Sequence, residues 1–260
     1  TVLASMVSYV YVVLEILMFN NFIHSSKGLF RNFTDKWLTN QIFYDVAPEL
    51  PPHMVKAVKY SIEYINQHSC VKWLQRNPVD TSVTEFVSFQ YFYHEDPDDS
   101  GCESSVGWKR RGQQVIFLGP ICMNDTVDNQ RTSVLHEMMH TMGLNHEHQR
   151  YDRDCYIDVH KFFVTRFPND LGIKPWPEYW TDWPYDFRSI LHYQGGYFYP
   201  YDDNQKMGRT DGTLSKFDFQ RLEYLYCGKR SYCSRPKNQN KCAQIRDEKK
   251  KNPKCPSNLP

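Results

Sequence analysis

Two histidines and a glutamate stand together near the middle of the chain, in the order His136-Glu137-Met-Met-His140. On an α-helix, residues four positions apart lie on one face, so both imidazoles can reach a single metal ion. Glu137 follows the first histidine and sits where a carboxylate can hold water at that ion. The short pattern also arises by chance on helices whose histidines are merely solvated, so it needs support from its surroundings.

The residues that follow supply this support. The chain continues Thr141-Met-Gly143-Leu-Asn-His146. Gly143 can adopt a positive φ and turn the backbone sharply, which brings His146 round as a third ligand. Three histidines leave a fourth position for water, as in catalytic zinc sites, and the segment offers no fourth protein ligand for a structural one. The full H-E-x-x-H-x-x-G-x-x-H pattern predicts one catalytic zinc ion on His136, His140 and His146.

Two helices are expected to position this site and the core behind it. The first runs from about Asn129 to Met142, carries the first two histidines and is stopped by Gly143. The second begins at Pro51-Pro52, has apolar residues spaced by three and four, and ends just before Cys70.

Strands and a third helix complete the predicted elements. Aromatic and β-branched residues predict strands at 42–46, 86–93 and 114–118. Ser215-Lys-Phe-Asp218 has the form of a capping box, and it predicts a helix that ends at Cys227. Residues 168–188 are rich in Pro, Trp, Tyr and Asp without periodicity, so we expect a long ordered loop that shapes the substrate pocket.

Composition restricts the class of protein. The 260 residues are long enough for one sizeable domain or two small ones, and 40% hydrophobic residues indicate a globular chain. A formal net charge of +1 gives no bias towards nucleic acid or an anionic membrane, so neither partner is expected. The first nineteen residues resemble the hydrophobic part of a signal peptide, and Glu15 within them argues against stable membrane insertion.

Cysteine usage points to an oxidising compartment. The chain has eight cysteines and no C-x-x-C pair, which favours disulfides over a zinc ribbon or a thioredoxin-like site. Sequons at Asn32 and Asn124 agree with a secretory route. The segment 228–260 is basic, with ten Lys or Arg against two acids, and we interpret it as a solvated tail in preference to a polyanion-binding patch.

The surroundings of the zinc motif resemble the astacin family of the metzincin clan. The third histidine is followed by Glu147 and then by Arg150, Asp152, Arg153 and Asp154, a string that looks like the astacin signature. The resemblance covers about residues 32–227. Its other motifs are Trp37 with Ile42-Phe-Tyr44, Gly107–Cys122, Tyr185–Tyr193 and Met207–Asp218.

This resemblance implies an α+β fold, namely a two-lobed zincin-like catalytic domain. A twisted, mostly parallel sheet and the active-site helix would lie above a largely irregular C-terminal lobe. The implied organisation is a signal remnant and short propeptide at 1–27, a catalytic domain at 28–227 and a cysteine-containing tail at 228–260. An incomplete growth-factor-like module is one interpretation of that tail.

The implied function is that of a secreted zinc-dependent endopeptidase, which hydrolyses internal peptide bonds of extracellular proteins. Glu137 would activate the zinc-bound water as general base, and Tyr193 would hydrogen-bond the oxyanion. The alternative is a catalytically weak or silent secreted binding module that keeps the fold. Leu191, where the family usually has Met, motivates that alternative. The change conserves volume, so we expect activity to be retained.

The resemblance also assigns supporting roles. Glu147 would anchor a mature amino terminus made by cleavage after Lys27 or Arg31. Protein or peptide substrates would bind extended along 114–118 as the edge strand, unless loops of the chain cover that edge. Two disulfides are implied, and four cysteines are left without assigned partners. The implied pairs are Cys70–Cys227 and Cys102–Cys122, and the remaining cysteines are Cys155, Cys233, Cys242 and Cys255. His148 and His192 are expected to support the site without binding metal.

Overall fold

The computed structural model describes residues 36–92, 101–174 and 182–256, which all fall within one compact unit. Four predictions lie outside this part of the chain. They concern the signal remnant and propeptide, the cleavage sites Lys27 and Arg31, the sequon at Asn32, and residues 175–181 of the long loop.

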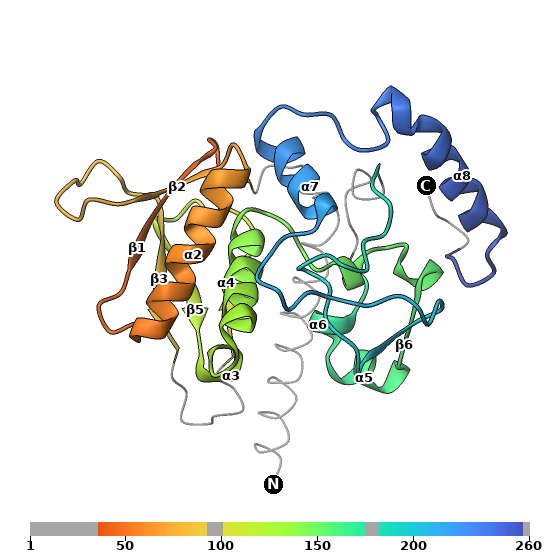
Figure 1. The fold of residues 1–260 in the computed structure, drawn as a ribbon, viewed down its shortest axis with the longest axis horizontal. Coiled ribbons are helices and arrows are strands. Elements are labelled where there is room, and N and C mark those ends of the chain that lie inside the picture. Colours follow the sequence, from red (N-terminus) through yellow and green to blue (C-terminus); the bar gives the residue numbers. More distant parts are fainter. Residues whose placement is uncertain (1–35, 93–100, 175–181, 257–260) are drawn as a thin grey trace, which may run out of the picture. The chain divides into compact units, whose positions relative to one another are not determined.

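A five-stranded sheet forms one lobe (Figure 1). Its strand order is β2-β1-β3-β5-β4, in which β4 is antiparallel to β5 and all other neighbours are parallel. The predicted mostly parallel sheet is therefore confirmed. The strands are β1 (Gln41–Val46), β2 (Lys72–Gln75), β3 (Phe86–Tyr91), β4 (Glu103–Ser104) and β5 (Gln113–Leu118).

β5 is not the edge strand that the sequence predicted. On the side away from β3 it pairs with β4, where Glu103 lies opposite Phe117 and Ser104 opposite Ile116. β4 has only two residues and no apolar alternation, so local pattern could not reveal it. The disulfide between Cys102 and Cys122 ties the start of β4 to the segment after β5. In the described sheet, β4 is the outermost strand on this side.

Two helices lie side by side against the sheet: α2 (Pro52–His68) and α4 (Val127–Thr141) (Figure 1). α2 has Pro52 in its first turn, where the missing N–H costs nothing. α4 begins two residues before the predicted start, because the Thr126 hydroxyl accepts a hydrogen bond from the Asn129 N–H. A short helix, α3 (Pro120–Met123), connects β5 to α4.

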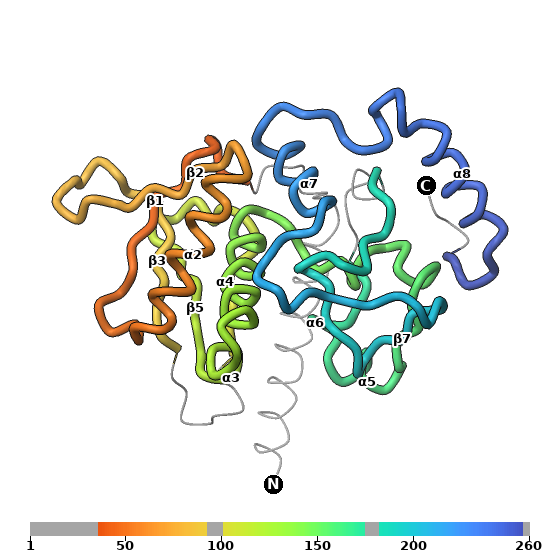
Figure 2. The backbone as a smooth tube through the Cα atoms, in the orientation of Figure 1, coloured from red at the N-terminus to blue at the C-terminus, as the bar shows by residue number. Residues whose placement is uncertain are grey.

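The second lobe is largely irregular, as predicted, and Figure 2 shows its winding backbone. A buried cluster that includes Ile157, Tyr185 and Phe198 forms its core. Residues 168–188 are not wholly a loop, because the first four form a short helix. The elements of this lobe are η2 (Glu147–Gln149), η3 (Arg153–Cys155), β6 (Ile157–Val159), α5 (Lys161–Arg166), α6 (Pro168–Leu171) and β7 (Phe198–Pro200).

Two longer helices, separated by residues 227–238, form the C-terminal part of the described chain. α7 (Lys216–Tyr226) starts with the predicted capping box, in which Ser215 and Asp218 each bind the other's backbone N–H. η5 (Pro236–Asn238) then leads into α8 (Gln239–Lys251), an element that the sequence reading did not predict. No helix in the described ranges has the length and apolar character that a membrane span needs.

All eight cysteines are paired. Cys70–Cys227 joins the end of α2 to the end of α7, and Cys102–Cys122 holds β4, so the structure has the two bonds that the family resemblance implied. The other two bonds, Cys155–Cys255 and Cys233–Cys242, both involve the tail.

The disulfide between distant elements should matter most for stability. Cys70–Cys227 spans a sequence separation of 157, and the chain-entropy model assigns such a bond about 5 kcal/mol. We expect the Cys70→Ala, Cys227→Ala double variant to lose unfolding free energy of that order, measured by denaturant titration.

The matched control is the Cys233→Ala, Cys242→Ala variant, whose bond spans a separation of only 9. The same model assigns it roughly 2.6 kcal/mol. Equal losses in the two variants would contradict the loop-length explanation.

Candidate active site

Three imidazole rings meet at the end of α4. His136 and His140 lie on successive turns of the helix, and Gly143, with a φ of 97°, turns the chain so that His146 faces them. The three Nε2 atoms lie 3.0 to 3.1 Å from one another. The structure therefore brings the three predicted ligands together in one cluster.

The hydrogen bonds of the rings show what this cluster can bind. Each Nδ1 faces an oxygen that can only accept, so Nδ1 carries the proton and Nε2 has a lone pair. Three lone pairs then point at one another, which is favourable only around a cation. The donor set suits zinc. The Nδ1 acceptors are Ile190 O at 2.8 Å, Leu144 O at 2.7 Å and Gln149 Oε1 at 3.1 Å.

The burial of the rings supports the same protonation state. Desolvation lowers the pKa of His140 and of His146 well below the usual value, and the neighbouring histidines lower it further. These two rings are thus neutral near pH 7, which is the form that binds metal.

Glu137 lies beside the cluster on α4 and is 6% exposed. Its Oε2 accepts a hydrogen bond of 2.7 Å from Ser104 Oγ, which also lies 3.0 Å from the Glu137 carbonyl oxygen. Burial raises the pKa of Glu137, while His136 and the Ser104 hydrogen bond partly oppose that rise. The sequence did not predict this contact of Ser104, because a serine in a two-residue strand carries no local signal.

Tyr193 borders the cluster from the second lobe. Its ring centroid lies 4.6 Å from that of His146 and 6.3 Å from that of His136. Desolvation by burial raises the pKa of Tyr193, so the phenol keeps its proton at neutral pH. A protonated phenol at this place can donate a hydrogen bond to a group bound at the cluster.

His148 and His192 support this arrangement. The His148 ring stacks on that of His146 at 4.8 Å, and its Nε2 lies 2.9 Å from Asp170 O. Its Nδ1 accepts from the Tyr193 N–H at 3.3 Å. His192 Nδ1 lies 2.6 Å from Tyr193 O, so both rings hold the tyrosine backbone in place.

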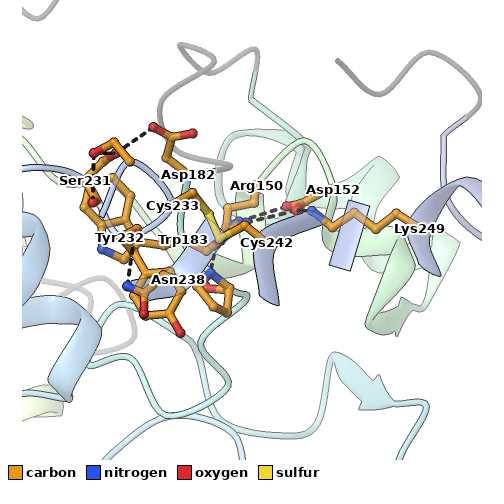
Figure 3. Close-up of a disulfide and its surroundings, with 12 residues drawn as sticks. Arg150, Asp152, Asp182, Trp183, Ser231, Tyr232, Cys233, Asn238, Cys242 and Lys249 are labelled. Atoms are coloured by element: carbon orange, nitrogen blue, oxygen red, sulfur yellow. Dashed lines mark hydrogen bonds and ion pairs between the residues drawn. A yellow bond between two sulfur atoms is a disulfide. The ribbon is translucent and has the colours of Figure 1, made fainter. Parts of the chain in front are cut away.

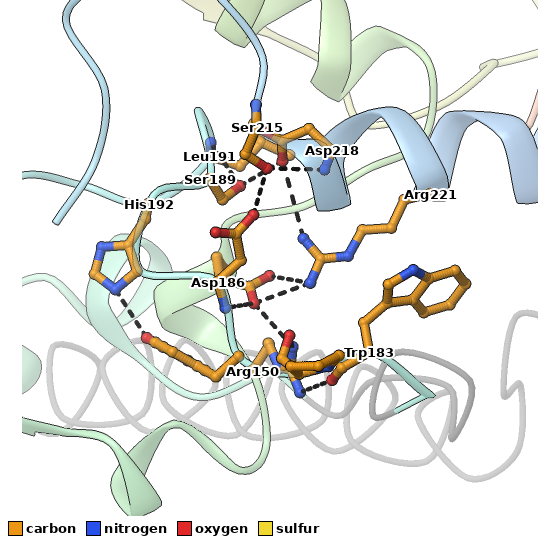
Figure 4. A network of polar contacts seen from close by, with 12 residues as sticks. Arg150, Trp183, Asp186, Ser189, Leu191, His192, Ser215, Asp218 and Arg221 are labelled. Atoms are coloured by element: carbon orange, nitrogen blue, oxygen red, sulfur yellow. Dashed lines mark hydrogen bonds and ion pairs between the residues drawn. The ribbon is translucent and has the colours of Figure 1, made fainter. Parts of the chain in front are cut away.

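Glu147 follows the third histidine and is fully buried. Its Oε1 accepts from Arg150 Nη1 at 2.8 Å, from Arg221 Nη2 at 2.9 Å and from the Asp186 N–H at 2.8 Å. Figure 4 shows Arg150, Asp186 and Arg221 together with Ser215 and Asp218. Burial alone would raise the pKa of Glu147, but Arg221 and Arg150 outweigh it and lower that pKa.

The predicted anchoring of a new amino terminus by Glu147 stays a prediction, because residues 1–35 lie outside the described part. The sequence reading missed Arg221 as a partner of Glu147. The two residues are 74 positions apart in the chain, and no local pattern connects them.

The turn that contains Leu191 holds two residues of the site through its backbone. Ile190 O binds His136, and Leu191 O accepts from the Glu147 N–H at 2.9 Å. The Leu191 side chain is 1% exposed. Both contacts are made by backbone oxygens and not by the Leu191 side chain.

The sequence matches known peptidases. A model of the Astacin peptidase family matches residues 30–227. Zinc metalloproteinase nas-12 of Caenorhabditis elegans is 31% identical over 164 residues, which are 62% of this chain and 38% of that protein. The astacin-like metalloendopeptidase of Mus musculus is 38% identical over 104 residues, 36% of this chain and 20% of that protein. The chain thus spans less than half the length of these curated relatives.

Solved structures share the fold. High choriolytic enzyme 1, a hatching enzyme zinc-protease from Oryzias latipes, superposes with a TM-score of 0.62 at 21% identity, over 77% of this chain and 98% of that one. Myroilysin gives a TM-score of 0.51 at 18% identity, over 74% and 96%. At such identities the likeness concerns the fold alone. The family match over most of the chain, together with this fold, shows that the protein belongs to the astacin family of peptidases.

Proposed function

We propose that the chain is a secreted zinc-dependent endopeptidase that hydrolyses internal peptide bonds of extracellular proteins. One observation carries the proposal: the Nε2 atoms of three histidines converge beside a buried carboxylate, Glu137. His136, His140 and His146 would hold the ion. When bound, zinc supplies a Lewis acid that polarises the scissile carbonyl and water.

The carboxylate of Glu137 serves as general base. Ser104 holds Oε2, and the second oxygen takes the proton of the attacking water and passes it to the leaving amine. The raised pKa of Glu137 makes the carboxylate a better proton acceptor than a solvated one.

Tyr193 stabilises the oxyanion. Its phenol keeps its proton and lies next to the histidine rings, so it can donate a hydrogen bond to the carbonyl oxygen as negative charge develops there. This contact strengthens in the transition state, which is the condition for a catalytic effect.

The substrate would bind as an added strand on β4 and not on residues 114–118. Backbone pairing with an outer strand holds a peptide extended. Ser104 of β4 binds Glu137 directly, so a peptide paired with this strand passes beside the catalytic carboxylate.

Secretion is supported by the four disulfides, because such bonds persist in oxidising compartments. Asn124 of the second sequon is exposed, so a glycan can be attached there. The alternative of a silent binding module is not favoured, since all three histidines, Glu137 and Tyr193 lie in one place.

The metal site can be tested through zinc content. We expect one zinc per chain in the wild type, and loss of most of it in His146→Ala, because two imidazoles hold the ion far more weakly than three. Elemental analysis after dialysis measures this. His53→Ala removes an exposed histidine and is the control. Full zinc in His146→Ala would contradict the assignment.

The base can be tested separately from the metal. Glu137→Ala should keep its zinc and lose on the order of 10²–10⁴-fold in kcat, the usual contribution of a general base. The measurement is cleavage of a quenched peptide, with Glu63→Ala on the exposed face of α2 as control. Turnover of Glu137→Ala within tenfold of wild type would exclude the role.

A substitution at Leu191 distinguishes an active enzyme from a chain that has lost its activity. Leu191→Met should change stability by less than about 1.5 kcal/mol, as volume-conserving substitutions do, and kcat/KM by less than about tenfold. The backbone contacts of the turn remain, which is the reason for near-equality. A rise of about a hundredfold in the Met variant would instead support the silent-module alternative.

A further inference from the structure

We infer that Lys249, from the basic tail helix α8, is a positioning residue for the zinc site. It ends a buried row of alternating charges that runs through Asp152 and Arg150 to Glu147, the neighbour of the ligand His146. The inference rests on the proposed peptidase function and extends it beyond the matched family segment, which stops at residue 227.

The tail is attached to the second lobe near both of its ends. Cys255 is bonded to Cys155, which lies nine positions after His146, and the Asn252 side chain donates to Cys155 O at 3.2 Å. At its other end, the Cys233–Cys242 disulfide packs on the buried ring of Trp183 (Figure 3). Two anchor points thus set the direction of α8 relative to residues 136–154, which we call the metal motif.

In this orientation of α8, the Lys249 side chain points into the second lobe. Its ammonium lies 2.5 Å from Asp152 Oδ2, and the two side chains are 11% and 0% exposed. Figure 3 shows it reaching the carboxylate from one side while Arg150 approaches from the other. The next residues, Lys250 and Lys251, are exposed, so the contact is specific to one position of the helix.

The charges continue from Asp152 towards the metal motif. Arg150 binds Asp152 with two nitrogens, Nε at 2.8 Å and Nη2 at 2.9 Å, and gives its third, Nη1, to Glu147 at 2.8 Å. Arg221 of α7 meets Glu147 from the far side at 2.9 Å. Lys249, Asp152, Arg150, Glu147 and Arg221 thus alternate in sign, and all are buried or nearly so.

Charge balance explains why this row of charges needs Lys249. Asp218 lies within 3.9 Å of Arg221, so the buried carboxylates Glu147, Asp152 and Asp218 face two guanidiniums from α7 and the metal motif. Asp186 is a fourth buried carboxylate beside them, and burial together with Asp218 raises its pKa to about 7. Lys249 supplies the third cation. Burial alone would raise the pKa of Asp152, but Arg150 and Lys249 lower it to about 2.

The influence of Lys249 reaches the ligand His146 through the backbone. The Glu147 N–H bonds to Leu191 O, and Arg150 also donates to Trp183 O at 3.1 Å and to Pro184 O at 3.2 Å. Without Lys249, Arg150 alone would face Asp152 and would shift its charge away from Glu147. The segment that begins at His146 would then be held less firmly, which loosens the third ligand.

The test compares Lys249→Met with Lys249→Arg and with the control Lys250→Met in the full-length chain. Lys249→Met keeps the apolar stem and removes the charge. We expect roughly tenfold weaker zinc affinity and roughly tenfold lower kcat, the usual size of effects from groups that support metal ligands. KM should change less than about twofold, because the substrate contacts are untouched. Lys249→Arg should restore both quantities, and Lys250→Met should change neither.

Several outcomes would overturn the inference. One is a folded Lys249→Met variant with wild-type zinc affinity, measured by competition with a chelator. Another is a lower melting temperature alone, with affinity and kcat unchanged below it, which would give Lys249 a purely structural role. If Lys249→Met does not fold, Lys249→Gln takes its place. Failure of both to fold, with Lys249→Arg folded, also refutes a role specific to the site.

The zinc measurement keeps this test separate from the proposed function. A wild-type protein that binds zinc but cleaves no peptide would refute the peptidase proposal. The affinity comparison among the Lys249 variants would still decide whether the tail positions the ligand.

Discussion

Three imidazole nitrogens face one another at 3.0 to 3.1 Å with their lone pairs inward, and much of the structure serves to hold them there. Neutral rings in this arrangement repel unless a cation lies between them. Each ring must therefore be fixed from behind by an acceptor at Nδ1. Two of these acceptors are backbone carbonyls, one in the Leu191 turn and one just after α4, and the third is the Gln149 side chain.

The segment that begins at the third ligand, His146, also carries the buried charges of Glu147, Arg150 and Asp152. Buried ion pairs contribute little net stability, because desolvation offsets their attraction, but removing one partner is costly. Such pairs are therefore best understood here as constraints on geometry. Glu147 connects α7, the Leu191 turn and the metal motif through Arg221, its own backbone and Arg150. Movement of any one of these would leave a buried charge without its partner.

The carboxylate beside the three histidines is constrained differently. Glu137 belongs to α4, but its orientation depends on Ser104 in a two-residue strand that a disulfide ties down. In the proposed function, substrate binding and base positioning share β4. A peptide paired with this outermost strand would lie next to the Ser104 hydroxyl that orients Glu137.

The sequence alone determined the three-histidine cluster and the place of Glu137 beside it, because a helical turn and one glycine bring these residues together through local geometry. It also determined the α7 capping box, whose signal is likewise local, whereas the mostly parallel sheet followed from the family resemblance. Only the tertiary structure decided which strand lies outermost, that Ser104 meets Glu137, and that Arg221 and Lys249 balance the buried acids. The last of these contacts joins residues 97 positions apart. Periodicity and capping act over a few residues, whereas such pairs form only once the chain has folded and desolvation requires each buried charge to have a partner.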